Sequence, residues 1–216
     1  MSFETKYLIR WGIPGWMLIF WIGTYYAISE SAYISAHLNF TEFGKLIGVF
    51  ISLSIFGVVV GYIIHHLYFV SNWIFNKNRI FDNAIKQVEN FPKPSNWKDN
   101  NKNDYFYFEV LWHENLLKLK EDKRNYIVER YRYLLSTIHA LGTVLVSHCL
   151  AILLTVIASV IKYGMLFFYQ IPVMAILFIQ VVIVVIAVLS FRYYSANLNY
   201  FQGNFLDKIH NNKLDM

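Results

Sequence analysis

Four long stretches of the chain contain no Asp, Glu, Lys or Arg. They lie between Arg10 and Glu30, Lys45 and Lys77, Arg132 and Lys162, and Lys162 and Arg192. Each is longer than the roughly 18 apolar residues that a helix needs to cross a bilayer. Segments 51–64 and 181–189 are apolar throughout, whereas strands of a membrane barrel would alternate apolar and polar residues. The pattern therefore predicts an all-α, polytopic membrane protein with four transmembrane helices.

Composition supports this class and the basic residues predict its orientation. Hydrophobic residues make up 56% of the 216 residues and charged residues only 15%, which is unlike a soluble domain. Seventeen of the nineteen Lys and Arg residues fall on one side of the four stretches, and only Lys45 and Lys162 fall on the other. The positive-inside rule then places both termini in the cytoplasm of a bacterial-type inner (plasma) membrane. The formal charge of +5 is explained mainly by this asymmetry and by lipid headgroups.

The spans divide the chain into four segments. We predict spans one and two in residues 1–76, a cytoplasmic helical hairpin in 77–132, spans three and four in 133–191, and a cytoplasmic tail in 192–216.

The hairpin is expected to extend spans two and three. No helix breaker occurs between Tyr62 and Phe91, and residues 105–161 contain no proline and a single glycine. We therefore expect one continuous helix over 105–161, covered by the apolar side of segment 80–91. The tail is expected to be interfacial at first and frayed at its end. Pro14 is expected at the start of a helix, where proline is tolerated.

Small and polar residues within the spans are the first candidates for function. Gly57 and Gly61 form a GxxxG pattern, which allows close helix–helix contact within the chain or between subunits. His148 and Gln180 are the intramembrane polar residues to test, because polar groups in spans are often functional. They are expected to bond across spans three and four or to line a pore in an oligomer.

Histidines offer a weaker metal or haem site. His65 and His66 lie near the cytoplasmic end of span two, and His139 lies at a similar depth on span three. Two histidines on facing helices are able to bind a metal or haem. No pair has the usual i,i+4 spacing, however, and no carboxylate lies within a span, so we predict no cofactor. The single cysteine, Cys149, forms no disulfide within the chain.

Arg132 and His139 are the only candidate catalytic pair. They lie two helical turns apart, so the guanidinium could bind a phosphodiester while the imidazole moves protons. This spacing resembles the arginine–histidine pattern of HEPN-type ribonucleases. Arg132 is equally the positive flank expected at the start of span three.

In size, layout and this arginine–histidine pair, the chain resembles the small multi-span accessory membrane proteins encoded beside bacterial defence systems, including RNA-targeting CRISPR loci. That resemblance implies a few spans joined to a helical cytosolic part, and no site residues are carried over from it.

The leading functional hypothesis is a self-associating inner-membrane protein, a homo-oligomer that forms a pore or perturbs the membrane. Its cytoplasmic helical part would receive a signal from a protein partner, and nucleic acid is not expected as a ligand. No phosphate-binding loop, nucleophile elbow or paired catalytic carboxylates occur in the sequence, which favours a protein that is not an enzyme. The alternatives are a membrane-face ribonuclease that uses Arg132 and His139, and a small transporter or haem-binding four-helix bundle.

Overall fold

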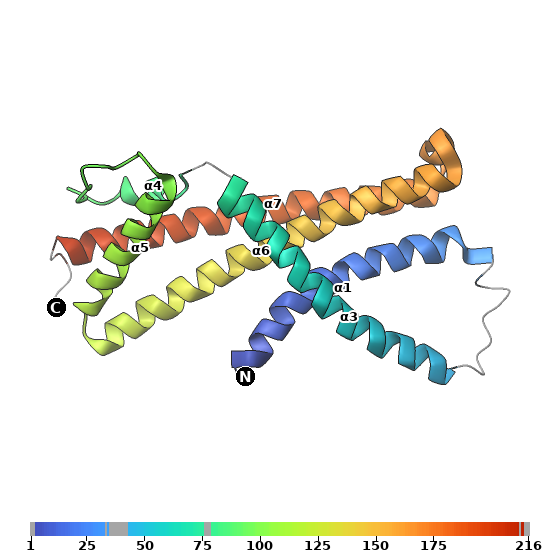
Figure 1. Ribbon diagram of the computed structural model, residues 1–216, viewed down its shortest axis with the longest axis horizontal. Helices are drawn as coiled ribbons and strands as arrows, with labels where there is room; N and C mark the ends of the chain where they lie inside the picture. The colour runs from blue at the N-terminus through green and yellow to red at the C-terminus, as the bar shows by residue number, and fades with distance from the viewer. Residues whose placement is uncertain (1–2, 33, 35–42, 76–78, 212, 214–216) are drawn as a thin grey trace. The chain divides into compact units, whose positions relative to one another are not determined.

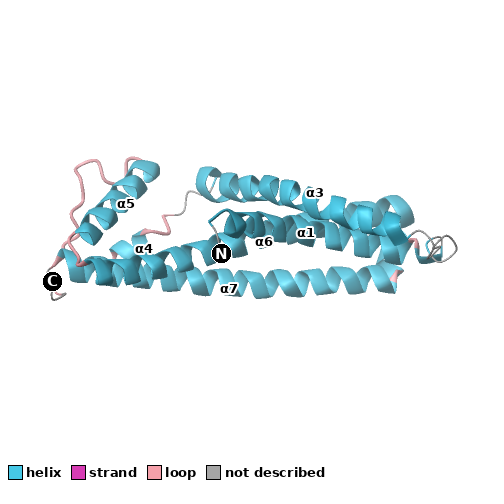
Figure 2. Cartoon of the chain, turned by 90° about the horizontal axis from the view of Figure 1, so that it is seen from below, coloured by secondary structure: helices cyan, strands magenta, loops and turns pink. Residues whose placement is uncertain are grey.

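All regular elements that the computed structural model describes are helical (Figures 1 and 2). The description covers the backbone of residues 3–32, 34, 43–75, 79–211 and 213, and their side chains except those of 3–10, 43–47, 50 and 73–75. No strand occurs in these ranges. The predicted all-α class is therefore confirmed.

The chain divides into two compact units. Unit 1 consists of Met1–Asn72 and Ala140–Ser190, and unit 2 consists of Trp73–His139 and Phe191–Met216. The predicted boundary at residues 76 and 77 falls outside the described residues.

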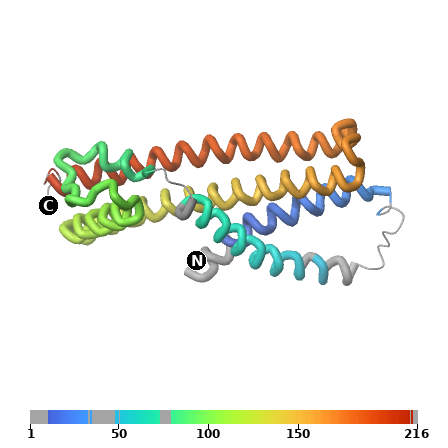
Figure 3. Tube along the Cα trace, turned by 45° about the horizontal axis from the view of Figure 1, so that its top comes forward, coloured from blue at the N-terminus to red at the C-terminus, as the bar shows by residue number. Residues whose placement is uncertain are grey.

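Two helices at the N-terminal side of the chain belong to unit 1, and two long helices contribute to both units. Helix α1 spans Phe3–Ser29 and α3 spans Phe43–Phe69, followed by a π-helix over Val70–Phe75. Helix α6 spans Glu121–Tyr163 and α7 spans Ile171–His210. In unit 1, α6 and α7 run side by side on either side of a turn (Figure 3).

The turn between α6 and α7 is a short 3-10 helix over Gly164–Tyr169. Gly164 has a φ of 59°, a left-handed conformation that glycine adopts without steric cost and that commonly ends a helix. Pro172 then lies in the first turn of α7, where its missing N–H removes no helical hydrogen bond.

Unit 2 adds two shorter helices, α4 over Asp82–Ile85 and α5 over Asn101–Leu117. The side chain of Asn100 caps α5 by accepting hydrogen bonds from the backbone N–H groups of Lys102 and Asn103.

Three helices among the described residues are long and apolar enough to cross a membrane, which indicates a membrane protein. They are Ile51–Asn72, Glu121–Tyr169 and Ile171–His210. The stretch predicted as span one forms α1, which is not one of the three. Its described part is rich in Trp, Tyr and Gly, residues that contribute little hydropathy.

The predicted extensions of spans two and three differ from the structure. Helix α3 ends at Phe69, and the only α-helix in segment 80–91 is the four-residue α4. The expected continuous helix over 105–161 is broken between α5 and α6. Leu119 is buried at this break and its N–H bonds the carbonyl of Leu116 at 3.2 Å, so the chain folds back and packs the apolar face of α5.

Most of the predicted tail is helical, and most of its last residues, where fraying was expected, lie outside the described residues. Helix α7 continues to His210, and Leu206 and Ile209 are buried in the core of unit 2. The sequence after the fourth candidate span is therefore part of a folded unit.

The core of unit 2 is aromatic and closely packed. Segment 80–91 contributes Ala84, Ile85 and Val88, and these pack with Phe108 and Trp112 of α5, as the sequence predicted. Trp112 is fully buried. Gly203 of α7 permits close packing here, because a Cβ at this position would press on the carbonyl oxygen of Ala84.

Candidate functional site

The GxxxG pattern on α3 is used within the chain, against α1. A Cβ on Gly61 would overlap the carbonyl oxygen of Trp11, and a Cβ on Gly15 would overlap the carbonyl oxygen of Gly57. Three glycines from two helices thus bring the backbones together, as small residues do in membrane helix pairs. The structure contains the internal contact, and a contact between subunits stays a prediction.

Helix α3 has a second small-residue face that meets no other helix among the described residues. A Cβ on Gly48 would find no heavy atom within 4 Å, and Ser52 is exposed. Each lies nine residues, or two and a half turns, before Gly57 and Gly61 respectively, so the two faces are opposite. A shallow groove follows this second face, lined by Gly48, Val49, Ser52, Leu53 and Phe56.

The hydroxyl of Ser52 is hydrogen-bonded within its own helix. Its Oγ donates to the carbonyl oxygen of Gly48 at 2.9 Å, a bond that satisfies the donor within the helix itself. The second face therefore combines two small residues in a shallow groove, and the Ser52 hydroxyl proton is already bonded within the helix.

His148 is buried in unit 1 and bonded on both ring nitrogens. The indole Nε1–H of Trp21 donates to His148 Nε2 at 3.3 Å, and His148 Nδ1 lies 2.9 Å from the carbonyl oxygen of Val144. Because Nε2 accepts the indole hydrogen bond, Nδ1 is assigned as the donor to the Val144 carbonyl oxygen. His148 thus bonds to Trp21 of α1, a contact beyond the bond across spans three and four and the pore lining that the sequence suggested.

Gln180 is fully buried and only half of its amide is bonded. Its Nε2 donates to Thr155 Oγ1 at 3.4 Å, and Ser159 Oγ donates to the carbonyl oxygen of Thr155 at 2.6 Å. Gln180 Oε1 has no hydrogen-bond partner among the described residues. A bond between α6 and α7 is one of the contacts the sequence suggested for Gln180.

Pro14 lies within α1 and provides an acceptor to another helix. The helix begins at Phe3, so the expectation that Pro14 starts a helix is wrong. Ser147 Oγ on α6 donates to the carbonyl oxygen of Pro14 at 2.6 Å. The buried Ser147 hydroxyl thus links α6 to the backbone of α1 within unit 1.

The histidines proposed for a metal lie on two different helices, α3 and α6. His65 and His66 are in unit 1, with the His66 ring edge-on to Tyr62 at 4.4 Å between centroids, and His139 is the last residue of that part of unit 2. No group of three potential ligands forms a metal site in the part of the chain that the structure describes.

The candidate catalytic pair lies on α6. Arg132 is exposed and His139 is half-buried, and seven residues of α-helix put both on one side. Their roles stay a prediction.

Unit 2 contains an ion-pair site that the sequence did not reveal. Arg79 donates to Asp82 at 2.9 Å and also bonds the buried carboxylate of Asp104, while its guanidinium lies 4.8 Å from the Phe81 ring and 4.9 Å from the Trp97 ring. Burial lowers the pKa of Arg79. The hydrogen bonds and negative charges of Asp82 and Asp104 raise it by more, so the net shift is upward.

A second polar cluster in unit 2 joins three helices at Glu109. Tyr131 on α6 donates to its carboxylate at 3.3 Å and Gln202 on α7 donates at 3.4 Å. Burial, the charge of Glu109 and a hydrogen bond to it raise the pKa of Tyr105. The two donors lie 22 and 93 residues from Glu109 along the chain, and no local pattern signals such a meeting.

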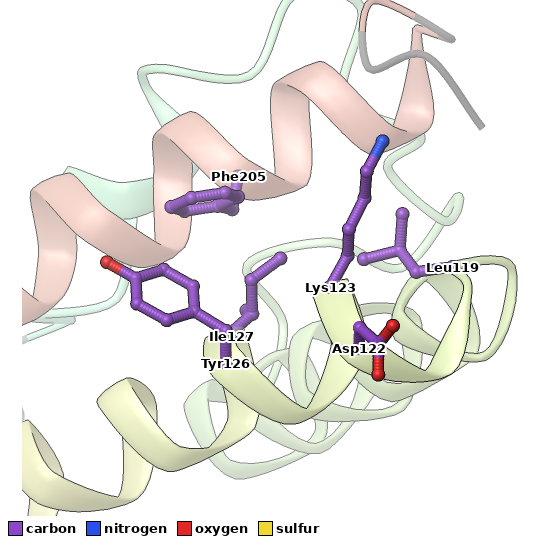
Figure 4. A pocket seen from close by; sticks show the side chains of 6 residues that line it. All are labelled: Leu119, Asp122, Lys123, Tyr126, Ile127 and Phe205. Carbon is purple, nitrogen blue, oxygen red and sulfur yellow. The ribbon is translucent and has the colours of Figure 1, made fainter.

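An apolar groove lies between the start of α6 and the end of α7 in unit 2 (Figure 4). Figure 4 shows the Phe205 ring of α7 facing Tyr126 and Ile127 of α6. The full lining is Leu119, Asp122, Lys123, Tyr126, Ile127 and Phe205.

Comparison with known proteins finds no matching family model, no matching curated protein and no matching solved structure.

Proposed function

We propose that the chain is a self-associating membrane protein with four spans, whose copies meet through the Gly48/Ser52 face of α3. The observation that carries this proposal is the pair of opposite small-residue faces on one helix. One face is occupied by α1 and the other meets no helix of the same copy among the described residues. In lipid, helices associate by close packing rather than by a hydrophobic driving force, and small residues permit that packing.

The first of the four spans would be α1. Its 27 residues are long enough to cross the hydrocarbon core at 1.5 Å per residue, and its glycine contact with α3 supports a shared membrane location. The excess of basic residues in segments 77–132 and 192–216 supports a cytoplasmic position for unit 2 and for both termini.

The proposed activity is a change in the bilayer, either a pore or a perturbation, controlled through unit 2. Its support is that α6 and α7 each supply residues to both units, so a protein bound to unit 2 contacts helices that continue into the candidate spans.

Two differently tagged full-length copies, expressed together and extracted in mild detergent, test the self-association. Wild-type copies are expected to co-isolate, and Gly48→Leu is expected to reduce co-isolation at least tenfold. Gly23→Leu is the matched control, because a Cβ at Gly23 also finds open space, on α1. Wild-type copies that never co-isolate would refute the proposal, and equal loss for the two variants would refute the assigned face. Release of a dye from vesicles that contain the protein tests the pore.

A further inference from the structure

Within unit 1, helix α6 buries polar side chains and exposes apolar ones. Leu153, Ile157 and Ile161 are 53%, 45% and 80% exposed, whereas a helix at the surface of a soluble protein exposes its polar face. In membrane-spanning helices, polar side chains that face the interior of the bundle often line the path of a permeant. The buried polar side chains, which we call the polar row, are Thr143, Ser147, His148, Thr155 and Ser159.

The polar row is almost as long as a bilayer is thick. Thr143 and Ser159 lie sixteen residues apart in one helix, or about 24 Å at 1.5 Å per residue, against roughly 30 Å of hydrocarbon core. Thr143 Oγ1 donates to the carbonyl oxygen of Ala140 at 2.8 Å, and Ser159 Oγ donates to that of Thr155 at 2.6 Å. A hydroxyl whose proton is bonded in this way still has oxygen lone pairs that accept a further hydrogen bond. The row therefore supplies acceptors along the interior of unit 1.

Two buried polar atoms on the neighbouring helices have no hydrogen-bond partner among the described residues. They are the hydroxyl of Tyr25 on α1 and Oε1 of Gln180 on α7. Tyr25 is 8% exposed and Gln180 is fully buried, held to the polar row by its bond to Thr155. A buried polar group without a partner is costly, and hydrocarbon offers it none. The two atoms therefore point to a small polar molecule that enters this interior.

The contacts between α1 and α6 show that these helices run in the same direction. Trp21 bonds His148, and eight residues later the carbonyl oxygen of Ser29 accepts a hydrogen bond from Lys162. The residue numbers of both helices thus rise together from the first contact to the second. A residue midway between the two contacts on α1 lies level with the residue midway between them on α6.

The two midway residues are Tyr25 and Thr155, and Thr155 is the residue that Gln180 bonds. The Tyr25 hydroxyl and the Gln180 carbonyl oxygen therefore lie at one level of unit 1. Tyr25 also packs in the same core as Ala151 of α6 and Ile176 of α7, and Ile176 is one helical turn before Gln180. A hydroxyl that both donates and accepts, and a carbonyl oxygen that accepts, are together the partners that a water molecule needs.

The chemistry of the lining favours water over ions. No Asp, Glu, Lys or Arg occurs between Arg132 and Lys162 or between Lys162 and Arg192, whereas ion channels select with charged side chains or rings of backbone carbonyls. Apart from His148, the row and its neighbours supply hydroxyl and amide groups, which carry no charge. We infer that the polar row, with Tyr25 and Gln180 at its middle, is a path for water through the interior of each copy. This inference rests on the proposed membrane location and assigns a permeant and a route within one copy.

Osmotic shrinkage of vesicles that contain the full-length protein, followed by stopped-flow light scattering, tests the path. Wild-type vesicles are expected to shrink at least fivefold faster than protein-free vesicles. Tyr25→Phe removes only the unpartnered hydroxyl and should reduce the excess rate at least threefold, and Gln180→Leu should do the same. Tyr26→Phe is the matched control, because it removes the same atom from the next residue, which is 55% exposed, and should keep the wild-type rate.

Vesicles that shrink no faster with the protein than without it would overturn the inference, as would equal rates for Tyr25→Phe and Tyr26→Phe. Release of a trapped dye at the same rate as water would overturn it in favour of a wide pore. Tagged copies are co-isolated from the same vesicles, and Gly48→Leu is expected to lose co-isolation while it keeps the water flux. Co-isolation without water flux removes this path alone, whereas water flux without co-isolation removes the proposed self-association alone.

Discussion

Unit 1 and unit 2 each have an apolar core with some buried polar groups, and they differ most in the side chains that they expose. Unit 1 buries small polar groups such as Ser147, His148, Thr155 and Gln180. Unit 2 buries aromatic and aliphatic side chains, while most of its charged residues are exposed. The outer surface of unit 1 is aliphatic, including Ile51, Ile55, Val59, Leu153, Ile157, Phe178, Val181, Val185, Ile186 and Leu189.

The difference is what a change of solvent produces. Water satisfies the charged surface of unit 2 and drives its aromatic side chains inward. Under the proposed membrane location of unit 1, lipid would do neither, so close backbone contact and internal hydrogen bonds would hold its helices together. Different kinds of substitution should therefore destabilise the two units. Four substitutions test this, given in order of the expected loss of stability.

Gly61→Leu should have the largest effect, because the new side chain would occupy the space of the Trp11 carbonyl group. Backbone of α1 cannot move aside as a flexible side chain would, so we expect a loss of about 3 kcal/mol or more, the upper end for overpacking. Unfolding in a titration with SDS, followed by tryptophan fluorescence, measures it. Gly23→Leu, with open space around it, should unfold like the wild type. Similar losses for both would show that the α1–α3 crossing does not limit stability.

Trp112→Ala should be the most damaging truncation in unit 2. The side chain is fully buried among Phe108, Leu116 and Tyr131, and its removal should cost about 3 to 5 kcal/mol, the range for buried aromatic residues. Pulse proteolysis in urea, with the protein in nanodiscs, reports this unit. Tyr126→Ala removes another aromatic ring that is 65% exposed and should change stability little. A mild Trp112→Ala phenotype would mean that unit 2 is not held by its aromatic core.

Asp104→Ala comes next, since it removes a carboxylate that is 4% exposed and leaves Arg79, 15% exposed, with Asp82. Breaking one partner of a buried pair typically costs about 3 to 5 kcal/mol; because Arg79 keeps Asp82, we expect about 2 kcal/mol. The comparison is Glu89→Ala, whose ion pair with Lys213 is exposed on both sides and should be worth at most about 1 kcal/mol. Equal losses in the same urea assay would refute the importance of burial here.

The sequence predicted the helical stretches well where one physical rule decided them. Absence of charge over more than 18 residues leaves few structures other than a membrane helix, and the stretches after Arg132 and Lys162 are indeed in α6 and α7. The buried state of His148 and Gln180 also follows from their position in such stretches.

Features that depend on packing between distant segments were not predictable. Residues 118–120 are good helix formers, yet the helix breaks there because burying Leu119 and the inner face of α5 outweighs local propensity. Gly15 follows Pro14, the residue that stands out in this stretch of the sequence. Its close contact is with the backbone of α3, more than forty residues away. The partner of Asp104 is twenty-five residues away in Arg79, and a surface charge pattern carries no sign of that pairing.

Gln180→Leu should have the smallest effect on stability of the four substitutions. It tests whether a buried polar group in unit 1 serves folding or function. Its single long hydrogen bond, 3.4 Å to Thr155, is of a kind that contributes about 0.6 kcal/mol on average between membrane helices. Leu removes that bond but also removes Oε1, a buried acceptor without a partner among the described residues, and the two effects should nearly cancel, leaving a change below about 1 kcal/mol in the SDS titration. Trp21→Phe is the contrast, because it leaves the Nε2 acceptor of His148 unpaired in the interior and should destabilise more than Gln180→Leu. A loss above about 2 kcal/mol for Gln180→Leu would show that its amide is a structural contact. A variant with unchanged stability that no longer releases dye from vesicles would show that the Gln180 amide is needed for the action on the membrane and not for folding. Gln180 would then be a functional residue in the interior of unit 1.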